Sequence, residues 1–420
     1  MKFETDGIRG HFGTVITTGL AYDFGLAFAA SIMASGASVT LAVARDTRTS
    51  GEVLEASLVA GMKAAGAKVM ITGIMPTPAL SQFILDGDLS GGIMITASHN
   101  PAEDNGLKPL NNMGKKLSSK DRDGIQHLLE CGVTPSKTIG SSYEVLNGPI
   151  PWLKKIWSEI EYSGVTGSLA GETIVVDSAN GAGRFLIGQA LSPFGAKVVQ
   201  IHNGGGDKIN LNCGSLYPQG LVEAVKAHGA IAGIALDGDG DRIQICDSDG
   251  KLYDGDDILW LLRGNSKIVV GTIMTNEGLA KALLSCGSHL HRVGVGDANV
   301  ADGMKRYWSP IGGEPSGHIL FEGGTPTSCG TFTAAKLLAL GPKKWADLTA
   351  DLKKTYQIAE KVPLQKIDHL DSEIKSLESK GLRVVVRASG TEPVIRLMVE
   401  GEDKRKAEDS MNILLKRVHK

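Results

Sequence analysis

A serine and a histidine stand side by side in the segment GGIMITASHNPAEDNGLK, which covers residues 91–108. The Ser98 hydroxyl is suited to carry a phosphoryl group, because a nucleophile that holds the group and hands it on splits one transfer into two easier steps. His99 could orient that group, and Lys108 could act as a general acid or base on a hydroxyl if burial lowers its pKa. The alternative is an Asn-Pro turn after a strand, in which Ser98 hydrogen-bonds to its own backbone.

Three aspartates alternate with glycines after an apolar stretch in IAGIALDGDGDRIQICDSDG, residues 231–250. The carboxylates of Asp237, Asp239 and Asp241 would repel one another unless a cation lay among them, and an all-oxygen ligand set suits Mg²⁺. The loop lacks the glycine and the glutamate that an EF-hand requires. The neighbouring Arg242 is suited to a phosphate oxygen. The alternative is an acidic turn that only faces solvent.

A third segment, IGGEPSGHIL, places three polar side chains at alternate positions of a glycine-rich loop. In an extended loop Glu314, Ser316 and His318 would point to one side. There they could hydrogen-bond to adjacent hydroxyl groups or to an amine of a sugar. The segment is not a nucleophile elbow, because Glu314 stands where that motif requires glycine. The alternative is a plain glycine turn.

A fourth segment, RASGTEPVIR, combines two arginines with hydroxyl side chains. Guanidinium groups bind phosphate oxygens in a bidentate way, so the segment could hold a phosphate dianion. The cradle would consist of Arg387, Ser389, Thr391, Arg396 and the backbone N–H of Gly390. The alternative is a hairpin loop that happens to carry two arginines. The sequence contains no Walker A loop and no complete dinucleotide fingerprint, so ATP and NAD are not supported.

Together the four segments offer a phosphoryl carrier, a Mg²⁺ site, a loop for hydroxyl groups and a separate phosphate clamp. A phosphosugar whose phosphate changes place needs two such phosphate-handling positions. The protein would phosphorylate the free hydroxyl from Ser98, let the bisphosphate turn over and take back the other phosphate. Positioning and charge neutralisation would then supply most of the catalysis.

One pattern of elements that could position these loops occurs three times, in residues 38–74, 172–203 and 266–297. Each copy has a β-branched apolar stretch, a polar loop, an amphipathic stretch that ends at a glycine, and a second apolar stretch. This β-α-β pattern predicts parallel strands joined by crossover helices, with ligands beyond the carboxyl ends of the strands. The end of the chain predicts a strand, a loop, a strand and a closing helix.

The sequence therefore predicts an α/β protein with three related mixed α/β domains and a smaller C-terminal α+β domain. The predicted domains are residues 1–147, 148–250, 251–359 and 360–420.

Bulk composition excludes several classes of protein. The 44 basic and 46 acidic side chains give a net charge of −2, so nothing favours nucleic acid or an acidic membrane surface. The five cysteines include no CxxC pair, which fits a reducing cytoplasm better than a disulfide framework. The uncharged stretch 25–44 is broken by ASGAS and predicts a helix and a strand rather than a membrane span.

The motifs TASHNP, DGDGDR, GGEPSGH and RASGTEP occur in the order seen in the α-D-phosphohexomutase superfamily, which the chain resembles over essentially its whole length. TDGIRG and ARDTRTSG also look like segments of that family. The resemblance implies four domains around a central active-site cleft and an active-site phosphoserine. It implies these roles: Ser98 as carrier and metal ligand; Asp237, Asp239 and Asp241 as Mg²⁺ ligands; His99, Lys108, Arg9 and Arg242 in catalysis; Glu314, Ser316, His318, Arg387, Ser389, Gly390, Thr391 and Arg396 in substrate binding.

Within the superfamily, TDGIRG, NCGS and SGTEP are similar to the phosphoglucosamine mutase branch. That similarity implies interconversion of glucosamine 6-phosphate and glucosamine 1-phosphate for cell-wall precursors, with a sugar 1,6-bisphosphate as activator. The implied protein is a cytoplasmic monomer or homodimer. The alternative is a phosphomannomutase/phosphoglucomutase. Residues 109–117, Ala298 and residues 327–330 depart from the family pattern.

Overall fold

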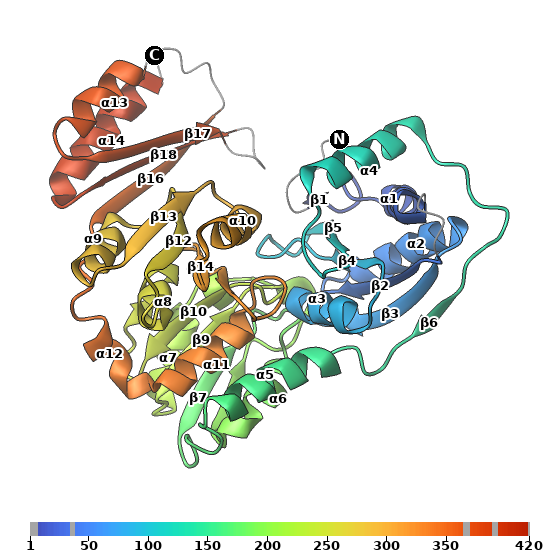
Figure 1. Cartoon of the computed structure of the whole chain (residues 1–420), viewed down its shortest axis with the longest axis horizontal. Helices are drawn as coiled ribbons and strands as arrows, with labels where there is room; N and C mark the ends of the chain where they lie inside the picture. The colour runs from blue at the N-terminus through green and yellow to red at the C-terminus, as the bar shows by residue number, and fades with distance from the viewer. Residues whose placement is uncertain (1–6, 34–37, 364–369, 389–393, 419–420) are drawn as a thin grey trace.

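The computed structural model describes residues 7–33, 38–363, 370–388 and 394–418. Four β-sheets follow one another along the chain, and each forms the centre of one domain (Figure 1). Three of the domains are mixed α/β, and the last is a smaller antiparallel α+β domain. The predicted fold class is therefore confirmed.

Domain 1 is built on a six-stranded sheet with the strand order β1-β5-β4-β2-β3-β6. Strands β4, β2, β3 and β6 are parallel, whereas β5 is antiparallel to both β1 and β4. Its elements are β1 (Ile8–His11), α1 (Thr18–Met33), β2 (Thr40–Arg45), α2 (Gly51–Ala64), β3 (Lys68–Ile74), α3 (Thr77–Asp86), β4 (Gly91–Ile95), β5 (Asp104–Asn111), α4 (Ser119–Cys131) and β6 (Ser142–Glu144).

Domain 2 has a five-stranded sheet in the order β11-β10-β9-β7-β8. The strands β9, β7 and β8 are parallel, and β10 returns antiparallel to β9. Its elements are α5 (Ile150–Tyr162), β7 (Thr173–Asp177), α6 (Leu186–Leu191), β8 (Lys197–Ile201), α7 (Gln219–Ala227), β9 (Ala232–Leu236), β10 (Ile243–Asp247) and β11 (Leu252–Tyr253).

Domain 3 has a four-stranded sheet in the order β13-β12-β14-β15, in which only β15 is antiparallel to its neighbour. Its elements are α8 (Gly255–Leu262), β12 (Ile268–Thr272), α9 (Glu277–Ser285), β13 (His289–Val293), α10 (Asp297–Tyr307), β14 (Ile311–Gly313), β15 (Ile319–Phe321), α11 (Gly330–Leu340) and α12 (Trp345–Leu348).

Domain 4 has an antiparallel sheet in the order β16-β18-β17. Its elements are β16 (Tyr356–Pro363), α13 (Asp371–Glu378), β17 (Arg383–Ala388), β18 (Val394–Gly401) and α14 (Lys404–Val418). The predicted division at residue 360 falls inside β16, which pairs with β18 along its whole length. The division therefore belongs before Tyr356, because a strand cannot be separated from the sheet that satisfies its backbone hydrogen bonds.

The three predicted β-α-β units all contain a parallel pair of strands, namely β2/β3, β7/β8 and β12/β13. The predicted glycines after the helices, Gly66, Gly195 and Gly287, all have positive φ angles, as helix C-terminal caps require. The helix of the second unit is shorter than its pattern suggests. Ala179 and Asn180 adopt left-handed conformations after β7, so the chain turns before α6 begins.

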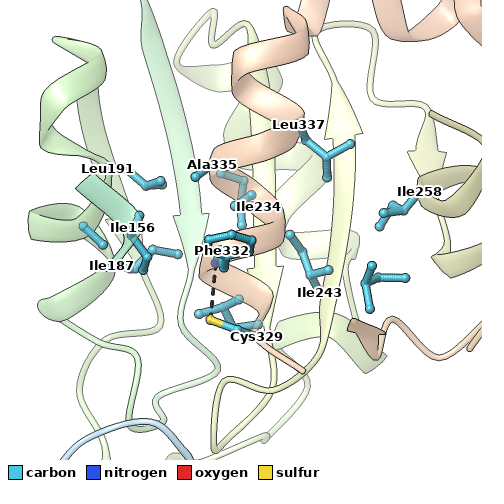
Figure 2. Packing of buried hydrophobic residues seen from close by; sticks show 14 of the residues in the cluster. Ile156, Ile187, Leu191, Ile234, Ile243, Ile258, Cys329, Phe332, Ala335 and Leu337 are labelled. Atoms are coloured by element: carbon cyan, nitrogen blue, oxygen red, sulfur yellow. Dashed lines mark hydrogen bonds between the residues drawn. The ribbon is translucent and has the colours of Figure 1, made fainter. Parts of the chain in front are cut away.

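The hydrophobic core joins the first three domains and leaves the fourth separate. One cluster of buried side chains extends from α3 in domain 1 through α5 and β9 in domain 2 to α11 in domain 3. Figure 2 shows Phe332 and Ala335 of α11 packed among Ile156, Ile187 and Ile234 of domain 2. Domain 4 has its own cluster between its sheet and its helices. No helix in the described ranges has the length and hydropathy of a membrane span.

Candidate active site

Each of the four segments singled out above connects two antiparallel strands. Residues 96–103 join β4 to β5, residues 237–242 join β9 to β10, and residues 314–318 join β14 to β15. The fourth connection joins β17 to β18. In each of the first three domains the strand that enters the turn also pairs with a parallel neighbour. The turns thus occupy equivalent places in three related sheets.

Ser98 lies in the first of these turns with its hydroxyl directed at an aspartate of domain 2. Its backbone is left-handed, with φ of 52°, and its N–H donates to the Thr96 hydroxyl at 2.8 Å. Its Oγ donates to Asp237 Oδ2 at 2.7 Å, and the side chain is buried. The alternative of a local turn bond to its own backbone is therefore not what the structure shows.

Arg48, which the sequence analysis did not select, holds the serine loop in place. Its Nη2 donates to the carbonyl oxygens of Ser98 at 3.0 Å and Asn100 at 2.9 Å, and its Nη1 donates to those of Asp104 and Pro101. The buried guanidinium is paired with Asp46 at 3.0 Å. The signal in the sequence was ARDTRTSG, in which a carboxylate and an arginine follow the end of β2.

The three aspartates lie together in the tight turn between β9 and β10. One carboxylate oxygen of each residue lies within 4.8 Å of the others, and Asp237, Asp239 and Asp241 are all buried. Burial and repulsion from the other two carboxylates raise the pKa of Asp237 to about 7. A solvated acidic turn would show neither the burial nor this shift, so the alternative reading of this segment is excluded.

Lys108 on β5 neutralises part of this charge across the domain boundary. Its Nζ donates to Asp239 Oδ2 at 2.9 Å and to Asp241 Oδ2 at 2.7 Å. Asp239 Oδ1 is buried and finds no hydrogen-bond partner among the described residues. An orphaned oxygen in a buried, all-oxygen set of three carboxylates fits a bound divalent cation such as Mg²⁺.

His318 connects the turn of domain 3 to the acidic cluster. Its Nε2 lies 3.1 Å from Asp241 Oδ1 and its Nδ1 lies 2.9 Å from Glu314 Oε2. Burial opposes the charged form, but the carboxylates of Asp241 and Glu314 together outweigh it and raise the pKa of His318 to about 10. The protonated ring donates to both carboxylates, so Arg242 Nε at 3.3 Å from Nε2 makes a contact rather than a hydrogen bond.

The structure modifies the prediction of three polar side chains on one side of this loop. Glu314 and His318 are buried and paired with each other, whereas Ser316 is exposed. The reason is that the segment forms the turn of a hairpin, in which Glu314 N donates to His318 O at 3.0 Å. Of the three, Ser316 is the one whose side chain faces outward.

Two arginines form the positive side of the site, and the neutral His99 lies beside them. Burial and the nearby charges of Arg242 and Arg9 lower the pKa of His99 to about 3, so its imidazole is neutral. His99 Nδ1 lies 3.4 Å from Ser98 Oγ. Arg9 reaches this region from β1, where it pairs in register with Gly106. Two guanidinium groups beside a serine hydroxyl are suited to the oxygens of a phosphoryl group.

Arg387 and Arg396 face each other across β17 and β18. Burial and the Arg396 charge lower the pKa of Arg387, while Glu314 of domain 3 acts in the opposite direction. Arg387 Nε is buried and has no hydrogen-bond partner within the described part of the chain. Adjacent guanidinium groups with an unused donor fit an anion such as phosphate. Ser389, Gly390 and Thr391 lie outside the described residues.

The stretch 109–117 contacts the residue that precedes Ala298, which the sequence analysis did not anticipate. Lys116, in the stretch after β5, forms a buried ion pair with Asp297, which precedes Ala298. This pair joins domain 1 to domain 3. In the third departure, the Cys329 sulfur accepts hydrogen bonds from Phe332 N and Trp152 Nε1, each at 3.3 Å, and so caps α11.

Four protein-family models match the chain, one for each of the four domains. Models of the phosphoglucomutase/phosphomannomutase family match as alpha/beta/alpha domain I at residues 1–132, domain II at 151–250, domain III at 254–358 and the C-terminal domain at 350–415. The phosphoglucosamine mutase of Pelotomaculum thermopropionicum is 36% identical, with 96% of this chain and 95% of that protein covered. The phosphoglucosamine mutase of Clostridium botulinum (strain Eklund 17B) is 37% identical, with 97% and 96% covered.

Solved structures share the fold. A phosphoglucomutase/phosphomannomutase family protein from Burkholderia thailandensis superposes with a TM-score of 0.81 at 23% identity, covering 99% of this chain and 96% of that one. The Aspergillus fumigatus N-acetylphosphoglucosamine mutase, solved in complex with GlcNAc-6P and magnesium, superposes with a TM-score of 0.67 at 16% identity. It covers 100% of this chain and 95% of its own.

The four matched domains and the curated relatives define a phosphohexomutase, and the chain belongs to the phosphoglucomutase/phosphomannomutase family. It is accordingly an enzyme of the isomerase class, a phosphosugar mutase.

Proposed function

We propose that this enzyme interconverts glucosamine 6-phosphate and glucosamine 1-phosphate through a phosphoserine at Ser98 and a sugar 1,6-bisphosphate. The observation that carries the proposal is the 2.7 Å hydrogen bond between Ser98 Oγ and Asp237 Oδ2, which joins the serine to the acidic cluster. The choice of glucosamine is supported by the curated relatives, which are named phosphoglucosamine mutase at 36–37% identity over at least 95% of their length.

The cation would be held by Asp237, Asp239, Asp241 and an oxygen of the phosphorylated Ser98. When bound, Mg²⁺ supplies positive charge to the transferring phosphoryl group. Lys108 holds two of the aspartates in position from β5. Arg9 and Arg242 would stabilise the charge on the phosphoryl oxygens from the other side.

In the forward half-reaction the bond between Ser98 Oγ and phosphorus breaks while a bond forms between phosphorus and the free hydroxyl of the sugar. The proton of that hydroxyl must leave as the new bond forms. Lys108 in its unprotonated form would accept this proton, as the sequence motif predicts. The neutral His99 imidazole would orient the phosphoryl group instead, because burial and the arginines lower its pKa to about 3 and leave it a weak base. The return half-reaction moves the other phosphate of the bisphosphate to Ser98, after the sugar has turned over.

The phosphate of the sugar that does not react would be bound by Arg387 and Arg396, and this would fix the position of the substrate. Arg387 and Arg396 present adjacent guanidinium groups, and Glu314 lies close enough to influence the first of them. Ser316, which is exposed in the domain 3 turn, is the side chain of that segment best placed to contact the sugar. Interactions of this kind bind ground state and transition state alike, so their loss should raise KM.

The alternative substrate class is mannose or glucose phosphates, which the family name allows. A coupled assay that compares kcat/KM on glucosamine, glucose and mannose 1-phosphates, with a trace of the matching bisphosphate, separates the two. The proposal requires glucosamine 1-phosphate to be preferred by at least about tenfold, a discrimination of about 1.4 kcal/mol. Equal or higher values on glucose or mannose 1-phosphate would overturn the choice of glucosamine but not the mutase reaction.

A further inference from the structure

A second group of metal-ligating side chains lies in domain 2, apart from the three aspartates. Asp177 is the last residue of β7, His202 follows β8, and Cys213 lies in the loop after them. One ligand atom of each lies within 4.8 Å of the others. Because β7 and β8 are parallel neighbours, their carboxyl ends bring the first two residues together, and the loop returns to place the thiol beside them.

The Asp177 carboxylate is fully buried and lacks a permanent counter-charge. Within the described ranges, no lysine or arginine forms an ion pair with it. Its contact with an ionisable side chain is the one between Asp177 Oδ2 and His202 Nδ1, at 2.9 Å. Its other contacts are backbone N–H groups, those of Ala179 at 2.8 Å and Gly214 at 2.9 Å. A buried carboxylate in such surroundings is stabilised by a cation.

Cys213 is buried beside this carboxylate. Burial and the Asp177 charge raise the pKa of its thiol to about 12, so it is no reactive nucleophile in the metal-free protein. Its Sγ receives a hydrogen bond from Asn180 Nδ2 at 3.6 Å. A sulfur held by an amide within reach of an imidazole and a carboxylate has the surroundings of a metal ligand with a supporting outer shell.

We propose that Asp177, His202 and Cys213 form a second metal site, which binds a zinc-type cation and serves the structure rather than the chemistry of the mutase. The choice of metal follows from the ligands, since a thiolate with an imidazole and a carboxylate suits Zn²⁺, whereas Mg²⁺ prefers oxygen alone. Binding replaces the S–H bond of Cys213 with a metal–sulfur bond and releases that proton to solvent.

The site would fasten the loop that supports the catalytic serine. Asn210, three residues before Cys213, donates from Nδ2 to the carbonyl oxygens of Ser98 at 2.8 Å and Asn100 at 2.9 Å. Its backbone N–H donates to Ala179 O at 2.9 Å. A cation that links this loop to β7 and β8 would therefore fix the position of Asn210. Through the hydrogen bonds of Asn210 it would also stabilise the serine turn of domain 1. This part of the inference rests on the proposed role of Ser98, whereas metal binding itself does not.

The test is a titration of chelator-treated enzyme with Co²⁺ in the presence of excess Mg²⁺, which occupies the oxygen-only cluster. Co²⁺ replaces zinc in such sites and gives a thiolate charge-transfer band in the near ultraviolet. We expect the band at one equivalent in the wild type, its loss in Cys213→Ser, and binding more than about tenfold weaker in His202→Ala. Zn²⁺ should displace Co²⁺ and raise the melting temperature of the wild type but not of Cys213→Ser.

Two control variants locate the site. Cys246→Ser removes a thiol that is also buried in domain 2 but belongs to β10, and it should keep the band. Asp239→Asn alters the acidic cluster and should also keep it. The proposal is overturned if the wild type shows no band, or if Cys213→Ser, folded by circular dichroism, binds Co²⁺ as the wild type does. If Cys213→Ser does not fold, unchanged Co²⁺ affinity in His202→Ala overturns it, since that side chain is partly exposed. Mutase activity on phosphosugars is measured separately, so either proposal can fail alone.

Discussion

At the scale of residues, the site depends on three buried carboxylates, one oxygen of which has no hydrogen-bond partner among the described residues. Asp237, Asp239 and Asp241 lie within reach of one another, and Lys108 pairs with two of them. The sequence was sufficient to predict this cluster, because alternation with glycine brings three nearby carboxylates into one turn. It could not predict that Lys108 comes from β5 of another domain to meet them, since no local pattern encodes that contact.

Asp239→Asn is expected to weaken the Mg²⁺ dependence of turnover. The orphaned Oδ1 oxygen of Asp239 is a natural cation ligand, and an amide in its place lowers the charge of the ligand set. The Mg²⁺ concentration for half-maximal activity should rise at least about tenfold, which corresponds to about 1.4 kcal/mol. Asp249→Asn, in the exposed turn after β10, is the control and should leave it unchanged. An unchanged magnesium dependence in Asp239→Asn would remove this residue from the ligand set.

At the scale of elements, three hairpin turns and the β17–β18 strand pair carry the candidate site residues, and the strands were largely predictable. The β-branched stretches predicted β2, β7 and β12, and glycines with positive φ end the predicted helical segments. The predicted division at residue 360 falls inside β16, because this strand is charged and half-exposed and so does not resemble a buried strand in the sequence. Arg48 escaped notice because its role, binding four carbonyl oxygens of the serine turn, exists only in the folded chain.

Arg48→Ala is expected to cost about 3–5 kcal/mol of the free energy of unfolding, because it leaves the buried Asp46 carboxylate without its charged partner and removes a donor from four carbonyl groups. Urea denaturation measures this cost. Arg306→Ala on the exposed side of α10 should change stability by no more than about 0.5 kcal/mol. A loss below about 1 kcal/mol in Arg48→Ala would show that the loop is held by other contacts.

Asp256, at the start of α8, makes stability depend on pH. Burial and the neighbouring Asp254 raise its pKa to about 7 in the folded protein, above its ordinary value. The folded state therefore holds this proton where the unfolded state has lost it, so the residue destabilises the fold as pH rises through about 4 to 7. Asp256→Asn keeps an acceptor oxygen for Asn276 N and removes the charge.

We consider the free energy of unfolding of Asp256→Asn minus that of the wild type. This difference should be near zero at about pH 4. It should rise by about 2–4 kcal/mol at pH 8. Denaturant unfolding at several pH values measures this difference. Asp302→Asn, exposed on α10, should give a difference that does not vary with pH. A flat difference for Asp256→Asn as well would contradict the assigned titration.

At the scale of the whole molecule, one hydrophobic cluster joins the first three domains, whereas domain 4 has only a cluster of its own. The shared cluster runs from α3 to α11, and the domain 4 cluster is separate (Figure 1). Polar contacts join domains 3 and 4, such as those from Arg383 to Ile273 O at 2.6 Å and from Glu277 N to Glu400 Oε1 at 2.6 Å. The order of motifs predicted four domains, but the shared core was beyond sequence reasoning because α11 packs on α5 and α6 of the preceding domain.

A chain that ends at Thr355 should therefore fold cooperatively. Its melting temperature should lie within about 10 °C of the full enzyme, since it loses polar contacts but none of the shared core. Its affinity for a phosphosugar should fall at least about tenfold, because Arg387 and Arg396 are gone. Arg387→Ala in the full chain should weaken binding while leaving the melting temperature nearly unchanged. Aggregation or non-cooperative melting of the shorter chain would contradict the separate cores.

The account as a whole depends on Ser98 as the residue that carries the phosphoryl group. The most direct measurement is rapid-quench labelling of the enzyme with a radiolabelled sugar 1,6-bisphosphate, followed by mapping of the labelled peptide. We predict label on the peptide that contains Ser98, and its transfer to sugar when glucosamine 6-phosphate is added. Ser98→Ala should take up no label and retain less than about one thousandth of the turnover, whereas Ser57→Ala on α2 should match the wild type. Label on another residue, or substantial turnover by Ser98→Ala, would contradict the account.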